Sequence, residues 1–438
     1  MKTVFLKSLM ASLVVTTASF AQDTQKPEAD VYQQLERFGA VLDEIQRDYV
    51  EEVDTKELID AAISGMLTSL DPHSSYLNEE DFQDMQETTT GEFAGLGIEV
   101  TQEEGFVKVV SPIDDSPATE AGLLAGDYIT HVDGETLLGL SLDESVNKLK
   151  GPIGTTVKIT VVREGEKEPF DVDITRDVIK AKSAKVRAEG NIAVIRMAQF
   201  NEQSYPNMAD GLKDVAEELG GEEKIEGYVL DLRNNPGGLL VTAIQVSDAF
   251  LEEGEIVSTR GRNENDSSRA NATKGDLANG KPVVVLINGG SASASEIVAG
   301  ALKDQHRAVI IGTPSFGKGS VQTIIPFEKT SALRMTTARY YTPSGRSIQG
   351  FGVEPDIYIE ALPRVLETDE PKSESFQRQQ EGDLRGAISN DSLTDEEIKI
   401  LEAERIEREE QTKIRETDIQ LSYALDMIHG MSVFEDDK

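Results

Sequence analysis

Residues 283–311 decide the fold, and they read VVVLINGGSASASEIVAGALKDQHRAVII. The run Val283–Ile287 is short and continuously apolar, which is typical of a buried strand. A glycine–serine turn follows it, then a helical pattern over 296–302 and a second apolar strand over 308–311. Strand, turn, helix and strand in this order predict a parallel sheet with helical crossovers.

The same alternation begins earlier in the chain. Strands are expected over 192–197 and 227–232, with a helix that runs to about Leu219 between them. The glycine-rich turn RNNPGG (233–238) joins the second of these strands to a helix over 240–251. The core therefore belongs to the α/β class.

Residues 91–178 differ from this core and indicate a compact mixed domain. The expected elements are strands over 107–110, 157–162 and 170–174 and helices over 118–123 and 142–149.

The N-terminus, MKTVFLKSLMASLVVTTASFAQ, has the pattern of a secretory signal. Lys2 and Lys7 precede an apolar run of about ten residues, which is too short to span a bilayer. Small residues precede a cleavage site after Ala21, so residues 1–21 are expected to be removed. We expect a protein exported to a periplasm and not spanning the membrane. The chain has no cysteine, which excludes disulfides and thiol chemistry.

The N-terminal region, residues 22–90, is expected to be helical. Its first helix carries an apolar heptad stripe made of Val31, Leu35, Phe38, Leu42, Ile45 and Tyr49. Such a stripe fits equally a helix that packs on its own domain and a contact between subunits. A second helix is expected over 56–70, where Asp71-Pro72 ends it.

The C-terminal region divides into an acidic linker, residues 363–390, and a helical tail, residues 391–438. Thr394 and Glu397 form a capping box, from which a helix can run to His429 with Gly430 as its C-cap. Its broken apolar stripe indicates an interface more than a core, and a solvated appendage is the alternative. The formal charge of the chain, −37, argues against nucleic acid as a partner.

The three serines Ser291, Ser293 and Ser295 lie between the buried strand and a helix start. Unpaired backbone N–H groups at such a junction favour negative charge, so a serine there could attack a carbonyl next to ready donors. Small residues also suit a tight turn, and one serine is needed as helix cap. The stretch alone therefore leaves catalysis and a structural role both open.

A nucleophilic serine needs a base. None of the four histidines supports a Ser-His-Asp triad, although the position of His73 in space stays open. Lys318, in TPSFGKGSVQ, is a better base because it follows the next strand, at the same edge of the sheet as the serines. Desolvation beside apolar strands would lower its pKa, and Gln322 could orient the neutral amine.

The segment 312–319, GTPSFGKG, almost matches a phosphate-binding loop. Gly319 replaces the required hydroxyl, and the following SVQTIIPF predicts a strand where that loop needs a helix. The nucleotide interpretation fails on both counts.

The segments GGSASASEIVAGALKDQHRAVIIGTPSFGKGSVQ, LDLRNNPGG and TTARYYTPSGRSIQGFGVEPDI together resemble the C-terminal processing peptidases, or tail-specific proteases, over roughly residues 30–362. The resemblance implies that Ser293 is the nucleophile, Lys318 the general base and Gln322 the residue that orients the lysine. Ser295 is then expected to cap the helix, while Ser291 keeps the turn small.

The resemblance also implies an oxyanion hole, formed by the backbone N–H of Ala294 and by that of Gly237 or Gly238. Asp304 matches an acidic position of the family, and we assign it a structural role. No metal or cofactor is implied. The implied fold is a crotonase-like core, residues 179–362, with a PDZ domain, residues 91–178, inserted before it.

The segment GLGIEV (95–100) resembles the loop with which PDZ domains bind a terminal carboxylate through backbone N–H groups. The residues implied for binding a peptide C-terminus are Gly95, Leu96, Gly97, Ile98, Val146 and Leu149. Of these, the four apolar side chains are expected to form a pocket.

The leading hypothesis is an exported, ATP-independent serine endopeptidase that recognises apolar C-termini and cleaves periplasmic or envelope proteins. A homo-oligomer is expected, with an adaptor protein as a possible further partner. Two alternatives are a PDZ scaffold or holdase with a vestigial core, and a crotonase-type acyl-CoA enzyme. The complete Ser293, Lys318 and Gln322 set disfavours the first, and the PDZ insert disfavours the second.

Overall fold

The computed structural model describes residues 27–103, 105–113, 116–361 and 417–435. The signal sequence, the linker 363–390 and the capping box at Thr394 lie outside these residues. The chain divides into two compact units, Met1–Leu70 and Asp71–Lys438. In the described residues, no helix combines the length and apolarity that crossing a membrane requires.

The first unit contains two helices, α1 (Pro27–Asp48) and α2 (Thr55–Thr68). Asp54 caps α2, because its side chain accepts hydrogen bonds from the N–H groups of Lys56 and Glu57. Much of the predicted heptad stripe on α1 is exposed, with Leu35 at 58% and Phe38 at 45%. Both helices were predicted. Among the described residues of this unit, no element buries the whole stripe.

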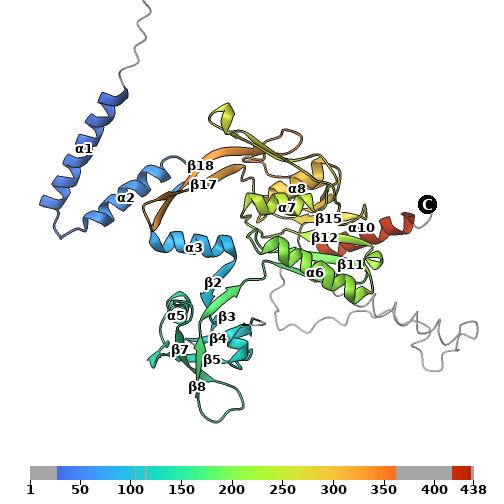
Figure 1. Cartoon of the computed structure of the whole chain (residues 1–438), viewed down its shortest axis with the longest axis horizontal. Helices are drawn as coiled ribbons and strands as arrows, with labels where there is room; N and C mark the ends of the chain where they lie inside the picture. The colour runs from blue at the N-terminus through green and yellow to red at the C-terminus, as the bar shows by residue number, and fades with distance from the viewer. Residues whose placement is uncertain (1–26, 104, 114–115, 362–416, 436–438) are drawn as a thin grey trace, which may run out of the picture. The chain divides into compact units, whose positions relative to one another are not determined.

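The second unit is built around a six-stranded sheet, visible at the right of Figure 1. Its order is β10 (Ala184–Glu189), β11 (Ile192–Met197), β12 (Gly227–Asp231), β15 (Val283–Ile287), β16 (Val309–Gly312) and β19 (Ile357–Tyr358). Only the β10–β11 pair is antiparallel, and the remaining pairs are parallel. The predicted strands 192–197 and 283–287 are confirmed residue for residue.

Successive residues of each central strand face opposite sides of the sheet. In β15, Val283, Val285 and Ile287 join one apolar cluster, and Val284 and Leu286 join another. The first cluster lies under the crossover helices α6 (Ser204–Leu219), α7 (Leu240–Asp248) and α8 (Ala294–Asp304). A strand that is apolar at every position thus needs cover on both faces.

The second face is covered by α10 (Ile419–Glu435), the red helix in Figure 1. Its buried apolar residues, spaced as one helical face, are Leu421, Ala424, Leu425 and Ile428. For Leu421, Leu425 and Ile428 the expectation of an interface or a solvated appendage is therefore wrong, because they complete the core. The other residues of the predicted stripe, Ile398, Leu401 and Ile414, lie outside the described residues. Gly430 as C-cap is also wrong, since the helix continues to Glu435.

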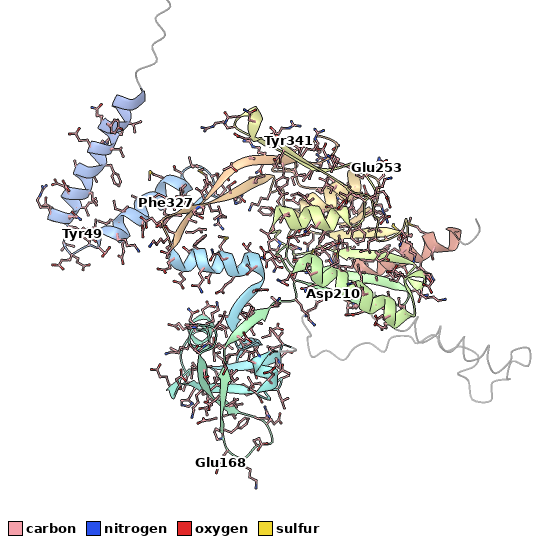
Figure 2. All side chains as sticks on the ribbon, in the orientation of Figure 1. Tyr49, Glu168, Asp210, Glu253, Phe327 and Tyr341 are labelled. Carbon is pink, nitrogen blue, oxygen red and sulfur yellow. The ribbon has the colours of Figure 1, made fainter. Side chains whose placement is uncertain are left out.

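A second sheet contains β1 (Ser75–Leu77), β13 (Glu255–Gly261), β14 (Ser268–Asn271), β17 (Ser320–Phe327) and β18 (Ser331–Tyr341). Its strands pair antiparallel, and β17 and β18 form a long hairpin. Phe327 and Tyr341, labelled in Figure 2, mark the end of β17 and the end of β18. The strand predicted after Lys318 is thus confirmed.

The predicted mixed domain has its own apolar core. It contains β3 (Ile98–Glu103), β4 (Phe106–Pro112), β5 (Tyr128–Val132), β6 (Glu135–Thr136), β7 (Thr156–Val162) and β8 (Phe170–Thr175), with helices α4 (Pro117–Glu120) and α5 (Leu142–Leu149). Helix α5 agrees with the prediction, while α4 is shorter than the predicted 118–123. Helix α3 (Glu79–Thr90) precedes this domain, and β2 (Glu92–Gly95) pairs with β9 (Asp177–Lys180), so the two ends of the insertion lie together.

Candidate active site

Ser293 is the residue immediately before α8, and its backbone is unusual. Its φ is 56° and its ψ is −112°, a region that residues with a side chain seldom adopt. Such backbone strain costs about 1–3 kcal/mol and is typical of functional sites. The Ser293 carbonyl accepts hydrogen bonds from the N–H groups of Glu296 and Ile297, so the main chain closes the first helical turn.

The two outer serines hold this turn against its surroundings. The Ser291 hydroxyl donates to the Leu232 carbonyl at 2.8 Å, and the Ser295 hydroxyl donates to the Asn235 carbonyl at 2.9 Å. Ser295 is therefore not the helix cap that we expected, because the cap position is Ser293 itself. Both outer hydroxyls fasten the serine turn to the end of β12 and to the turn that follows it.

Glu296 joins the serine turn to the lysine loop. Its side chain is fully buried, and its Oε2 accepts hydrogen bonds from the backbone N–H groups of both Ser293 and Lys318, each at 2.8 Å. Its Oε1 accepts from the Ser315 hydroxyl and the Gly317 N–H, each at 2.6 Å. One carboxylate oxygen thus brings the two main chains together. The sequence offered one signal that we missed, a carboxylate in the otherwise apolar helix EIVAG.

Lys318 is half-buried, in the loop that connects β16 of the six-stranded sheet to β17 of the second sheet. Burial, and then the positive charge of Arg334, lower the pKa of its amine, while the negative charges of Asp71 and Glu296 oppose this. This environment therefore lowers the pKa of Lys318, which is the direction that the sequence predicted. A lowered pKa gives more neutral amine near neutral pH, as a general base requires.

Tyr340, on β18, is a second residue that the sequence did not point to. Its hydroxyl donates a hydrogen bond to the Lys318 carbonyl. Burial raises the pKa of the phenol, and the influence of the Ser293 side chain opposes that rise. The tyrosine is therefore neutral, and its hydrogen bond is to the lysine loop.

His73, left open by the sequence, lies near Lys318. Its pKa is lowered by burial, then by the charge of Lys318, while Asp71 raises it. The Asp71 carboxylate, however, accepts from the backbone N–H groups of His73 and Ser74 and from the Ser74 hydroxyl. In the described part of the chain no hydrogen bond joins the imidazole to Asp71 or Ser293, so a Ser-His-Asp arrangement is absent there.

Gln322 lies on β17, where the pairing with β18 shifts register between Val321 and Gln322. Its amide nitrogen donates to the Ser320 hydroxyl at 2.9 Å and to the Thr336 hydroxyl at 3.3 Å. The contact with Lys318 that we expected is not among the hydrogen bonds of the described residues. The amide nitrogen is instead held by these two hydroxyls, one on β17 and one on β18.

The glycines of RNNPGG lie directly against the serine turn. At Gly237, φ is 101°, and an added Cβ would come within 2.8 Å of the Ser293 Cβ and 2.9 Å of the Ala294 nitrogen. The Gly237 N–H donates to the Asn235 side chain. Gly238 pairs with Phe200 in a parallel bridge that uses the Gly237 carbonyl and the Leu239 N–H. The Gly238 N–H therefore points away from that bridge, so it is the freer of the two donors.

The predicted peptide-binding loop of the mixed domain is closed on one side. The carbonyls of Leu96 and Gly97 accept hydrogen bonds from the N–H groups of Ala118 and Ile113. Gly97 has φ of 80°, and a Cβ there would meet the Ser116 side chain at 2.2 Å, so only glycine fits. Leu96 and Leu149 are buried in the domain core, whereas Ile98 and Val146 are half-buried. Of the predicted pocket, Ile98 and Val146 are the accessible part.

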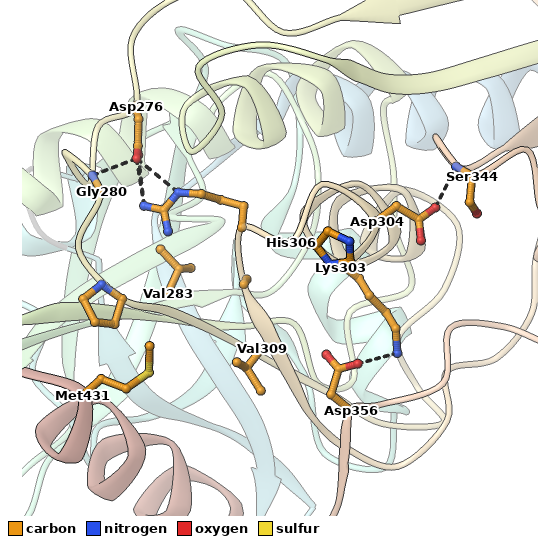
Figure 3. Close-up of a pocket in the computed structure, with 13 residues that line it drawn as sticks. Asp276, Gly280, Val283, Lys303, Asp304, His306, Val309, Ser344, Asp356 and Met431 are labelled. Atoms are coloured by element: carbon orange, nitrogen blue, oxygen red, sulfur yellow. Dashed lines mark hydrogen bonds and ion pairs between the residues drawn. The ribbon is translucent and has the colours of Figure 1, made fainter. Parts of the chain in front are cut away.

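An open pocket of about 800 Å³ lies at the other end of α8 (Figure 3). Two ion pairs line it, since Lys303 binds Asp356 at 2.8 Å and Arg307 binds Asp276 at 2.9 Å. Asp304 accepts a hydrogen bond from the Ser344 N–H, which is a structural contact. The described residues contain no cluster of His, Cys, Asp or Glu suited to hold a metal ion.

Three family models match the chain. The model described as "Peptidase family S41" matches residues 191–359, and a "PDZ domain" model matches residues 94–174. A third, "Activating protease CtpB N-terminal domain", matches residues 4–81. The first two coincide with the six-stranded core and with the inserted mixed domain.

Similar proteins carry consistent names. The chain is 55% identical over 352 residues to "Carboxy-terminal-processing protease" of Bartonella bacilliformis, and the match covers 80% of each chain. It is 34% identical to "Carboxy-terminal processing protease CtpA" of Bacillus subtilis, covering 77% of this chain and 71% of that one. A solved structure, "Photosystem II D1 C-terminal processing protease", is 28% identical over 74% of this chain and 92% of its own, with a TM-score of 0.43.

Proposed function

Because the chain belongs to the carboxy-terminal-processing proteases, which are serine-type endopeptidases with a PDZ domain, we propose that Ser293 and Lys318 form its catalytic dyad. The Ser293 oxygen attacks the scissile carbonyl carbon, and the Lys318 amine takes the hydroxyl proton. The observation that carries this assignment is the Glu296 carboxylate, one oxygen of which binds the backbone N–H groups of both residues.

The tetrahedral intermediate carries a negative oxygen, which needs donors. We assign them to the N–H groups of Ala294 and Gly238, since the Gly237 N–H is bound to Asn235. When the intermediate collapses, the C–N bond breaks and Lys318 returns the proton to the leaving amine. Water then attacks the acyl ester on Ser293, with Lys318 again as base, and the free serine is restored.

Gln322 has a positioning role in this proposal. The side chain lies on the strand that follows Lys318, with its nitrogen bound to Ser320 and Thr336. In this proposal the amide leaves these two hydroxyls during catalysis and turns toward the lysine amine. Asp304 remains structural.

Substrate delivery belongs to the PDZ domain. A peptide C-terminus would add as a strand, with its carboxylate on the backbone N–H groups of the loop Gly95–Ile98 and its last apolar side chain on Ile98 and Val146. The signal-like N-terminus supports export to a periplasm, where envelope proteins would be the substrates. The exposed apolar stripe of α1 supports self-assembly, which would restrict access to the active site.

The dyad is tested by three variants, Ser293→Ala, Lys318→Ala and Lys318→Arg, each assayed on an unfolded polypeptide with an apolar C-terminus. All three are expected to be inactive with the fold intact, since a guanidinium does not lose its proton near neutral pH. Substantial proteolysis by Lys318→Arg would contradict the general-base role. Proteolysis retained by all three variants would contradict the dyad, and absence of proteolysis in the parent protein itself would favour a PDZ scaffold whose core does no chemistry.

A further inference from the structure

Arg233, the first residue of the RNNPGG turn, is held by two carboxylates from distant parts of the chain. Its Nε and one terminal nitrogen donate to Asp231 at 2.9 and 2.8 Å. Its two terminal nitrogens also donate to the two oxygens of Asp418 at 2.8 and 2.7 Å. The side chain is only 14% exposed. Such bidentate pairs fix the guanidinium in orientation as well as position.

Asp418 also caps the N-terminus of α10. Its Oδ1 also accepts a hydrogen bond from the Leu421 N–H at 3.0 Å, which is the bond of a helix N-cap. The neighbouring Gln420 accepts from Arg233 at 3.0 Å and donates to the Ile359 carbonyl at 2.6 Å. The start of the tail helix is therefore attached both to the glycine-rich turn and to the chain just after β19.

The turn leads from Arg233 to the proposed oxyanion donor within five residues. The Arg233 carbonyl accepts a hydrogen bond from Arg196 at 2.5 Å. The next residue, Asn234, has φ of 53° and is bonded to Asn288, which precedes the serine turn. Gly237 then packs against Ser293. Arg233, Asn234 and Asn235 are each hydrogen-bonded to neighbouring segments, so the turn that carries the amide donors is held from Arg233 onward.

We infer that Asp418 is a positioning residue for peptide hydrolysis: through Arg233 the tail helix holds the RNNPGG turn so that its amide donor faces the carbonyl attacked by Ser293. This inference rests on the proposed dyad and oxyanion hole. It makes the C-terminal helix, which packs on β12, β15 and β16, a contributor to the catalytic unit.

The charges of the cluster explain why one carboxylate matters. Arg196 binds Asp231 at 3.1 Å, so two guanidinium groups alternate with two carboxylates. Without the charge of Asp418, the Arg196 and Arg233 guanidinium groups share one carboxylate, that of Asp231, in a region that is largely buried. Repulsion between the guanidinium groups then displaces Arg233, because Asp231 is its one remaining charged partner among the described ion pairs and Gln420 supplies only a neutral acceptor.

The decisive variant is Asp418→Asn in the full-length protein. Asparagine caps helices as well as aspartate does, so α10 keeps its N-cap while the ion pair loses its charge. Asp276→Asn is the matched control, because it also removes the carboxylate of a buried arginine pair, at the pocket of Figure 3, away from the turn. Arg233→Lys is a second test, since lysine keeps the charge and loses the fork.

For Asp418→Asn and Arg233→Lys we expect kcat for a short peptide substrate to fall about tenfold with KM nearly unchanged, as for loss of a transition-state donor. The rate at which Ser293 reacts with a fluorophosphonate should fall by a similar factor, because the phosphonyl oxygen binds the same N–H donors as the oxyanion. Asp276→Asn should stay within about twofold of the parent. The double variant should be no worse than Arg233→Lys alone, since both act through one contact.

The inference is overturned if Asp418→Asn and Arg233→Lys fold and keep the parent kcat and fluorophosphonate rate. It is also overturned if Asp276→Asn lowers kcat equally, because the effect would then be one of general stability. Failure of the proposed dyad has a different signature, in which Ser293→Ala still hydrolyses the peptide and the parent protein takes no fluorophosphonate on Ser293.

Discussion

Replacing Glu296 tests whether one buried carboxylate holds the serine and lysine loops together. In Glu296→Gln the side chain can keep its oxygen at the position of Oε2, where Ser293 and Lys318 donate, and place its NH₂ at the position of Oε1. There the Ser315 hydroxyl can rotate to accept, but the Gly317 N–H faces a donor. One buried amide is left without an acceptor, which costs about 1–3 kcal/mol.

Glu296→Ala removes the acceptor from three backbone amides at once, those of Ser293, Gly317 and Lys318. At about 1–3 kcal/mol for each of the three amides, the loss of folding free energy is about 3–9 kcal/mol. This is comparable to the whole stability of a domain, roughly 5–15 kcal/mol. We therefore expect the alanine variant to lose activity together with the folded core, and the glutamine variant to keep the fold and part of the activity.

The chain has no tryptophan, so calorimetry is the better assay of unfolding. For a core of this size, 1–3 kcal/mol corresponds to a fall in Tm of about 2–12 °C in Glu296→Gln. Glu255→Gln is the control, because Glu255 pairs with the exposed Arg269, and its Tm should change little. An unchanged core transition in both Glu296 variants would refute the reasoning.

Four further results are expected. Activity should rise with pH through the lowered pKa of Lys318, since only the neutral amine accepts a proton; in pH–rate profiles, Arg334→Met should move the rise to higher pH and Asp71→Asn to lower pH, and equal profiles would contradict this. Gly237→Ala should lower kcat by about 10²–10³, because its Cβ would push against Ser293; parent-like kcat would argue against this packing. Amidation of a substrate's C-terminus should slow its cleavage, and equal rates for the free and amidated forms would remove the PDZ loop from substrate delivery. Substitution of the exposed stripe of α1 by Leu35→Lys should lower the mass found by light scattering, and an unchanged mass would exclude this stripe from self-assembly.

The sequence predicted the core sheet well because its signals are local. Val283–Ile287 is apolar at every position, and such a run fits only a strand covered on both faces. What covers the second face was not predictable from local pattern, since α10 is separated from β19 by a long stretch of chain. Its four buried residues have the same spacing as those of an exposed interface helix, and only the partner decides between the two.

The residues of the candidate site also fall into two groups, those that the sequence indicated and those that only tertiary contacts reveal. Lys318 could be chosen because it follows a strand at the same edge of the sheet as the serines, whereas the choice of Ser293 among the three serines came from the family resemblance. Glu296 and Tyr340 were missed. A carboxylate in an otherwise apolar helix marks Glu296 only weakly, because glutamate is common in the first turn of a helix, and a tyrosine in a strand is ordinary in sequence. Their roles come from tertiary contacts, as does the choice of Gly238 over Gly237, which depends on a hydrogen bond to Asn235.

The central claim is that Ser293 is the nucleophile and Lys318 its base. The most direct measurement is peptide mapping by mass spectrometry after reaction with a fluorophosphonate, at several pH values. The account predicts one adduct, on Ser293, which forms faster as pH rises and is absent in Lys318→Arg. An adduct on another serine, or labelling of Ser293 in Lys318→Arg at the parent rate, would contradict it.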